Sequence, residues 1–284
     1  MKDLLCSHEI MKHMHSDAKL YIHASLESTN DTAKVLPGAE HGTTIIADTQ
    51  SAGRGRNGRK FFSPQGCGIY MSVVLLPAQL WHGTTKGGVL ECGPGLVTPG
   101  AAVAVCEAIE TIISSSRKKK CPTQQAGQPY EESIAPQIKW VNDILIDGKK
   151  VCGILTEAVA DAAGMIKRII VGIGINFTLP PGGYPAELAE SVGAVADLKI
   201  NCYTRNRLIA EVHNRLMANL NTAHKIIPAY KKRLLMLRRR ISVICPEGTY
   251  EATPLDVDSN GGLVVEKDCG EILTLTSGEI SIRF

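Results

Sequence analysis

The amino-acid sequence predicts an α/β fold, in which a mixed β-sheet is flanked by helices and followed by a small C-terminal β-barrel. Up to about residue 238, runs rich in β-branched residues alternate with stretches of helical spacing. Beyond that point, short strand-like runs follow one another with turn residues between them. A chain of 284 residues is long enough for one large and one small domain. We therefore expect an N-terminal lead at 1–20, a main domain at 21–238 and the barrel at 239–284.

The first elements surround a basic, glycine-rich loop. The run YIHASLESTNDTAKVLPG predicts a short strand, a turn and a helix that begins between Thr29 and Asp31. The reason is that Ser, Thr, Asn and Asp cap helix N-termini. The β-branched runs TTIIADTQSA and IYMSVVLL are typical of strands. The loop GRGRNGRKFFSPQGCG lies between these two strands.

Two insertions interrupt the main domain, near 78–97 and 114–136. The first is rich in Gly and Thr, and the second is polar and charged with Pro and Gly, which is typical of a surface excursion. Between them, TPGAAVAVCEAIETII has the composition and capping of a helix.

The remainder of the main domain is predicted to contain a hairpin, a buried strand and helical segments. Two apolar runs flank Asp147-Gly148, a dipeptide that favours hairpin turns. The run IIVGIGINF indicates a buried strand, and residues 203–238 place Leu, Ile, Val and Met at helical spacing.

Composition excludes several classes of protein. With 44% hydrophobic residues, 21% charged residues and a net charge of +3, the chain is neither disordered nor a broadly basic nucleic-acid binder. Its 9 cysteines form no CxxC pair and no zinc-like cluster, so we expect reduced thiols and a cytoplasmic location. We predict no signal peptide and no segment long and apolar enough to span a membrane.

The loop at residues 53–60 contains the pattern GxGxxG. A dinucleotide-binding turn requires a helix directly after the glycines, whereas a strand is predicted here, and no GK[ST] closes a P-loop. The loop instead gathers Arg54, Arg56, Arg59 and Lys60, whose side chains can close over a carboxylate or phosphate. A solvated, partly disordered hairpin is the alternative.

Two further motifs follow the loop. Lys139-Trp140-Val141-Asn142-Asp143 precedes Lys149-Lys150-Val151-Cys152-Gly153, and a lysine near Asn and Asp suits phosphate and magnesium handling. In the string VGIGIN, two strand glycines permit close approach of a ligand or another backbone. An ordinary hairpin and tight strand packing are the alternatives for these two motifs.

Together with Ser28-Thr29-Asn30, these motifs resemble those of the biotin protein ligases, also called biotin–[acetyl-CoA-carboxylase] ligases or holocarboxylase synthetases. The resemblance runs from about Tyr21 to Phe284, and its most specific string is TQSAGRGRNGRK. It implies a class II synthetase-like catalytic fold with an SH3-like C-terminal barrel.

The resemblance also implies a two-step reaction. Biotin reacts with ATP, assisted by Mg²⁺, to form biotinyl-5′-AMP, and a lysine of an acceptor carboxylase carrier domain then takes the biotin. A lipoate or octanoate ligase and a non-catalytic biotin-binding module remain alternatives.

Site residues are implied by position. Lys150 and Arg54 would be catalytic. The biotin and adenylate site would be formed by Ser28, Thr29, Asn30, Gln50, Gly53, Arg54, Arg56, Lys150 and Gly153. The ATP site would be formed by Arg56, Arg59, Lys60, Phe61, Asn142 and Asn176, with Asp143 near the metal.

The sequence departs from the family pattern in three places. Phe61 stands where tryptophan is common, which keeps a π face but loses an indole donor. Val141 replaces the proline of the usual KWPND. Only about twenty residues precede the ligase region, so we expect no DNA-binding role. We expect a monomer or homodimer without membrane contact.

Overall fold

The computed structural model describes residues 3–80, 84–85, 88–89, 93–118, 135–195, 205–245, 248–276 and 279–282. Its helices are α1 (Ser7–Met11), α2 (Thr29–Val35), α3 (Pro77–Leu80), α4 (Pro94–Lys118), α5 (Arg205–Leu220) and α6 (Ile226–Arg233), with 3-10 turns at Arg56–Gly58 and Ala223–Lys225. Its strands are β1 (Leu20–His23), β2 (Thr44–Ala47), β3 (Gly68–Leu75), β4 (Thr84–Thr85), β5 (Gly88–Val89), β6 (Gln137–Lys139), β7 (Asp143–Ile146), β8 (Lys149–Ala160), β9 (Ile166–Asn176), β10 (Ile241–Cys245), β11 (Gly248–Val257), β12 (Leu263–Lys267), β13 (Ile272–Leu275) and β14 (Glu279–Ile282).

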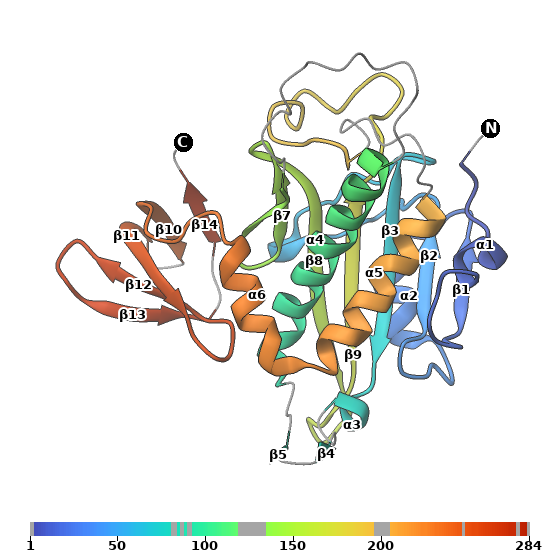
Figure 1. Ribbon diagram of the computed structural model, residues 1–284, viewed down its shortest axis with the longest axis horizontal. Coiled ribbons are helices and arrows are strands. Elements are labelled where there is room, and N and C mark those ends of the chain that lie inside the picture. The colour runs from blue at the N-terminus through green and yellow to red at the C-terminus, as the bar shows by residue number, and fades with distance from the viewer. Residues whose placement is uncertain are drawn as a thin grey trace.

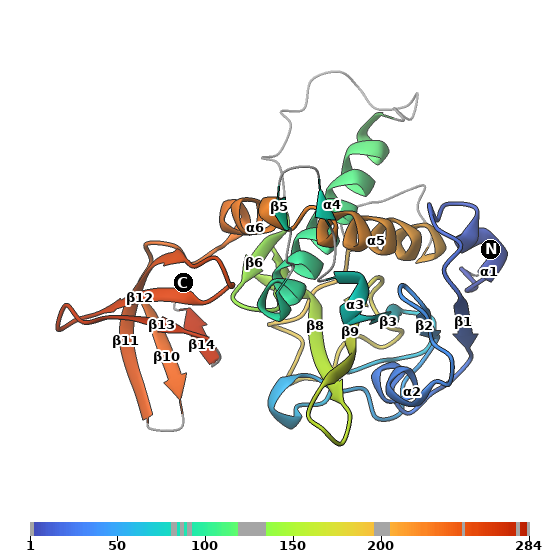
Figure 2. The ribbon, with the colours of Figure 1, turned by 90° about the horizontal axis from the view of Figure 1, so that it is seen from below.

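A seven-stranded mixed sheet forms the centre of the main domain. Its order is β1-β2-β3-β9-β8-β7-β6, and β1 pairs in parallel with β2 while the other neighbours are antiparallel. Helices α4 and α5 lie across one face of this sheet and α2 lies against the other (Figures 1 and 2). The predicted mixed sheet flanked by helices is therefore confirmed.

Local sequence explains several element boundaries. Helix α2 begins at Thr29 as predicted, with the Ser28 hydroxyl accepting a hydrogen bond from the Asp31 amide at 3.4 Å. The β7–β8 hairpin turns at Asp147 and Gly148, whose φ values of 50° and 74° are those of a tight hairpin turn. Both predictions are confirmed.

Helix α4 is longer at both ends than the helix predicted for TPGAAVAVCEAIETII, residues 98–113. It begins at Pro94, inside the segment expected to be an insertion, because proline suits the first turn of a helix where its missing N–H removes no bond. The helix ends at Lys118, inside the segment expected to be a second insertion at 114–136, of which residues 119–134 lie outside the described residues.

Our expectation that no segment could span a membrane was wrong by length and composition. The stretch Pro94–Ser115 of α4 is long and apolar enough, yet 72% of its apolar window is buried inside the protein. Its residues Ala101 to Ile112 pack against α5, α6 and the sheet, so the helix has the burial of a core helix.

The C-terminal segment forms a second sheet of five antiparallel strands, in the order β13-β12-β11-β10-β14. It begins at Ile241, close to the boundary that we place near Arg239. This sheet contacts the main domain through the turn before β12. The Trp140 indole donates a hydrogen bond to the Gly261 carbonyl at 3.0 Å, and Trp140 is buried.

The N-terminal lead packs onto helix α5. Asn206 binds the backbone of Leu4 and Cys6, and Asn214 binds the backbone of His13 and His15. The buried Arg205 side chain hydrogen bonds to the backbone of Asp3 and, at 2.6 Å, to the carboxylate of Asp48. The lead is thus tied to the same helix at several points.

Candidate functional site

A cavity of about 480 Å³ opens on the sheet beneath the basic loop. Its walls come from the start of α2, the loop at 53–62, the strands β3, β7, β8 and β9, and the segment 184–192. Ile280 of the second sheet also reaches it. The volume lies in the range of small-molecule sites, roughly 300–1,000 Å³.

A β-bulge directs Lys150 into this cavity. Leu145 pairs with Lys150 and Ile144 with Cys152, so Val151 is an extra residue on β8. In a regular strand, residues three apart point to opposite faces. Here a Cβ on Gly153 would lie 3.2 Å from Lys150 Nζ, so positions 150 and 153 share the cavity face.

Lys150 is paired with the acid of the second motif. Its Nζ lies 2.7 Å from Asp143 Oδ1, with 33% and 23% of the two side chains exposed. The contact is close but not aligned as a hydrogen bond, and Asp143 Oδ1 is buried without a hydrogen-bond partner. The ammonium and the carboxylate therefore neutralise each other at the wall of the cavity.

The main chain of Lys150 is held from both sides. Its N–H donates to the Ser191 carbonyl at 2.8 Å, and its own carbonyl accepts from Gly193 N at 3.0 Å and from Asn176 Nδ2 at 3.2 Å. This clamp fixes the strand position from which the lysine side chain extends.

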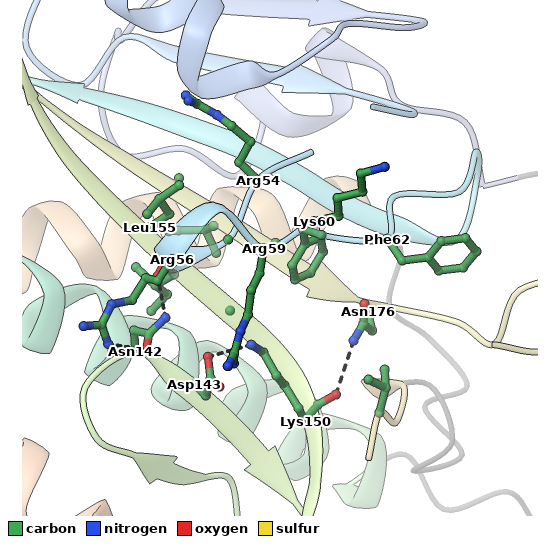
Figure 3. Close-up of a pocket in the computed structure, with 18 of the residues that line it drawn as sticks. Arg54, Arg56, Arg59, Lys60, Phe62, Asn142, Asp143, Lys150, Leu155 and Asn176 are labelled. Atoms are coloured by element: carbon green, nitrogen blue, oxygen red, sulfur yellow. Dashed lines mark hydrogen bonds and ion pairs between the residues drawn. The ribbon is translucent and has the colours of Figure 1, made fainter. Parts of the chain in front are cut away.

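The loop carries its arginines in two directions. It closes as a hairpin, in which the Phe61 amide donates to the Gly53 carbonyl at 2.8 Å and the Gly55 amide donates to the Arg59 carbonyl at 2.7 Å. Figure 3 shows Arg56 and Arg59 extending toward Asn142 and Asp143, and Arg56 Nη1 lies 3.3 Å from Asn142 Oδ1. Arg54 points the other way.

Arg54 is paired with carboxylates outside this cluster. Its guanidinium forms an ion pair with Asp31 and lies 3.3 Å from Glu157 Oε2. The Glu157 carboxylate also binds Lys34 Nζ and Asn30 Nδ2, each at 2.8 Å. Although its partial burial opposes ionisation, these hydrogen bonds and the charges of Lys34 and Arg54 hold the pKa of Glu157 below its usual value.

A buried polar network forms the floor beside α2. Ser72 Oγ lies 2.7 Å from Thr29 Oγ1 and 2.6 Å from Asn30 Oδ1. Gln50 Oε1 accepts from the Thr29 amide at 2.9 Å, and Gln50 Nε2 donates to Ser63 Oγ at 3.1 Å. Such a network fixes the direction of each amide.

Phe61 lies on the strand glycines. A Cβ on Gly174 would come 2.6 Å from the Phe61 ring, and one on Gly153 would come within 3.3 Å of it. The ring also meets Tyr70 edge to face at a centroid distance of 6.3 Å. Gly174 of the VGIGIN string and Gly153 therefore make room for an aromatic side chain, whereas a Cβ on Gly172 would lie 2.2 Å from Asn30 Oδ1.

The structure brings nearly all the expected site residues to one cavity. The lining includes Ser28, Thr29, Asn30, Gln50, Arg54, Arg56, Arg59, Lys60, Phe61, Asn142, Asp143, Lys150, Gly153 and Asn176. Gly53 is not among the lining residues. It is buried behind the loop, where a Cβ would lie 2.7 Å from the Phe61 carbonyl, so its place is in loop closure.

Sequence reasoning missed several residues of the site. Ser72 and Glu157 belong to the polar network, Asp31 pairs with Arg54, and Tyr184 and Ile280 add to the wall. Ser72 carries a weak signal as a lone polar residue in the apolar run IYMSVVLL. Nothing in the sequence connects Ile280 to the cavity.

A lysine and an arginine loop around one small-molecule cavity favour an anionic ligand, because ammonium and guanidinium groups bind carboxylates and phosphates. Comparisons with known proteins identify the class. Residues 22–176 match the model of the biotin/lipoate A/B protein ligase family.

Individual relatives agree with this match. The chain is 32% identical over 275 residues to the bifunctional ligase/repressor BirA of Bacillus subtilis, covering 93% of this chain and 74% of that protein. It is 26% identical to the biotin–[acetyl-CoA-carboxylase] ligase of Mycobacterium tuberculosis, covering 92% and 88% of the two chains. The fold superposes on a biotin protein ligase from Aquifex aeolicus, in complex with biotin and ATP, with a TM-score of 0.71, 24% identity and coverage of 93% and 98%.

The chain belongs to the biotin/lipoate A/B protein ligase family, since the family model covers more than half of it.

Proposed function

We propose that this protein is a biotin protein ligase, which activates biotin with ATP and transfers it to a lysine of an acceptor protein. The observation that carries the proposal is the cavity in which Lys150 and Asp143 lie 2.7 Å apart beneath the arginine loop. The names of the relatives support biotin as the acid that is activated.

The first step joins the biotin carboxylate to the α-phosphorus of ATP. A carboxylate oxygen forms the new P–O bond, and the bond from the α-phosphorus to pyrophosphate breaks. Because the carboxylate is already ionised near neutral pH, this step depends on alignment and on neutralising negative charge. Lys150, fixed by its backbone clamp, is the cation best placed to do so.

Binding roles follow from position in the cavity. The polar floor at Ser28, Thr29, Asn30 and Gln50 would bind biotin, and the half next to Asn142 would bind ATP. Arg56 and Arg59 extend toward that half, and Phe61 offers a ring face for the adenine. Lys60 and Asn176 would complete the nucleotide contacts.

Magnesium is part of this proposal through Asp143. Among the described residues, no three His, Cys, Asp or Glu side chains group as a metal cage. A magnesium ion on phosphates commonly takes only one or two carboxylates, and the Asp143 carboxylate, which lines the cavity, would supply one such ligand. The ion would neutralise phosphate charge.

The second step attacks the mixed anhydride. The neutral amine of an acceptor lysine bonds to the biotinyl carbonyl carbon, AMP leaves, and the amine loses a proton. We propose the carrier domain of a biotin-dependent carboxylase as the acceptor, supported by the named acetyl-CoA-carboxylase ligases. The loop side chains would shield the anhydride from water until then.

ATP–pyrophosphate exchange on the purified protein tests the proposal. Biotin, lipoate, octanoate and no acid are compared in the presence of Mg²⁺. We expect exchange that depends on biotin. Exchange with lipoate or octanoate alone would assign the protein to another branch of the family, and no exchange with any acid would contradict adenylation.

A further inference from the structure

The guanidinium of Arg54 is held outside the phosphate-facing half of the cavity. It pairs with Asp31 on the first turn of α2 and lies 3.3 Å from Glu157 on β8. In Figure 3, Arg54 points away from Lys150 and Asp143, whereas Arg59 extends toward Asp143 and Arg56 toward Asn142. In the absence of a substrate anion, the Arg54 guanidinium is thus neutralised by two carboxylates of the protein.

The two carboxylates differ in how firmly they are held. Glu157 is 24% exposed and is fixed by Lys34 and Asn30 at 2.8 Å each, so it keeps its place whether or not Arg54 stays. Asp31 is 50% exposed, and its side chain pairs with Arg54 and with Lys34, the latter at 3.2 Å. Exposed ion pairs of this kind contribute little net stability in water.

We propose that Asp31 is a positioning residue, which holds the Arg54 guanidinium at the α2 side of the cavity, outside its phosphate-facing half, until a substrate carboxylate or phosphate displaces Asp31 from it. Arginine forms planar bidentate hydrogen bonds with carboxylates and with phosphates, so a substrate anion can replace Asp31 with little change in free energy. Competition from Asp31 thereby lowers the affinity of Arg54 for the substrate anion. The inference rests on the proposed function only for the identity of that anion.

Limited trypsin digestion of the ligand-free full chain tests whether the Asp31–Arg54 ion pair restrains the loop. Trypsin can cleave this loop after Arg54, Arg56, Arg59 and Lys60. In Asp31→Asn we expect cleavage after Arg54 to rise about threefold or more, since the guanidinium loses its outer partner. Asp31→Glu, which keeps a carboxylate there, is expected to restore slow cleavage.

The matched control is Asp268→Asn. Asp268, in the turn between β12 and β13, forms an exposed ion pair with Arg240 at 2.5 Å. Its substitution is expected to leave loop cleavage unchanged. Equal cleavage of Asp31→Asn and the wild type would overturn the inference, whatever the substrate proves to be.

Biotin titration calorimetry tests the consequence for binding. Asp31→Asn is expected to bind biotin about two- to fivefold more tightly, with ATP affinity unchanged, because one competing carboxylate is gone. In an Arg54→Ala background the same substitution is expected to have no effect, since Asp31 acts through that arginine. An equal gain in both backgrounds would refute the mechanism.

The two proposals fail separately. A wild-type protein that binds no biotin and catalyses no exchange would contradict the proposed function, while the digestion still decides whether Asp31 holds the loop. Normal exchange with unchanged digestion would leave the function standing and remove the role of Asp31.

Discussion

At the scale of single residues, the site depends on one lysine placed by backbone geometry. Lys149 and Lys150 are adjacent and chemically identical, yet only Lys150 lines the cavity and pairs with Asp143. Lys149 is exposed, and a Cβ on Gly193 would meet its Cβ at 3.0 Å. The direction in which each lysine side chain extends therefore decides which of the two can act in the cavity.

Replacing Lys150 by Ala is expected to slow biotin-dependent pyrophosphate exchange by about a hundredfold or more, roughly 3 kcal/mol, because a preorganised cation is lost from the developing phosphate charge. Lys149→Ala is the control and should keep near wild-type rates. Comparable losses in both variants would show that general charge, not the directed Lys150 ammonium, matters.

At the scale of elements, the centre of the site is formed by β8 and β9, whose glycines face each other. Gly153 pairs with Gly174 in the antiparallel register. Both lie under the Phe61 ring, which crosses from the loop. The glycine pair thus leaves a flat strand surface for the Phe61 ring, and a side chain at either position would take up the space of that ring.

Substituting Gly174 by Ala should displace Phe61, because the new Cβ would lie 2.6 Å from the ring. Crowding of this kind costs roughly 1–3 kcal/mol, so we expect the KM for ATP to rise about tenfold while the KM for biotin changes less. In a Phe61→Leu background the same substitution should have a smaller effect. If only the KM for biotin changed, the Phe61 ring would contact biotin rather than the adenine of ATP.

At the scale of the whole molecule, α5 ties the N-terminal lead to the sheet through a buried histidine. His213 Nε2 lies 3.2 Å from Ser16 Oγ, and its Nδ1 lies 3.1 Å from Thr44 Oγ1. Burial, with a smaller contribution from the charge of His41, lowers the pKa of His213 to about 4. The folded protein therefore keeps this ring neutral.

Stability should depend on pH through His213. Because the pKa of about 4 in the folded protein lies below the ordinary histidine pKa of 6.5, the unfolded chain binds the proton first as pH falls. The contribution is fully present above about pH 6.5 and is lost progressively toward pH 4. We expect the wild type to lose about 2 kcal/mol more than His213→Gln between pH 7.5 and 5.0 in urea unfolding. Parallel losses would contradict a buried neutral His213.

Local sequence patterns were sufficient to predict the order of the motifs, the α2 start at Thr29, the Asp147-Gly148 turn and the identity of most cavity residues, because caps, turns and residue types act locally. Three features of the site became visible only in the folded chain. A bulge at Val151 directs Lys150 into the cavity, and Asp31 and Glu157 form ion pairs with Arg54. Ile280 of the second sheet lines the cavity. These contacts join segments distant in the chain, and their existence depends on sheet register and packing, which no local pattern encodes.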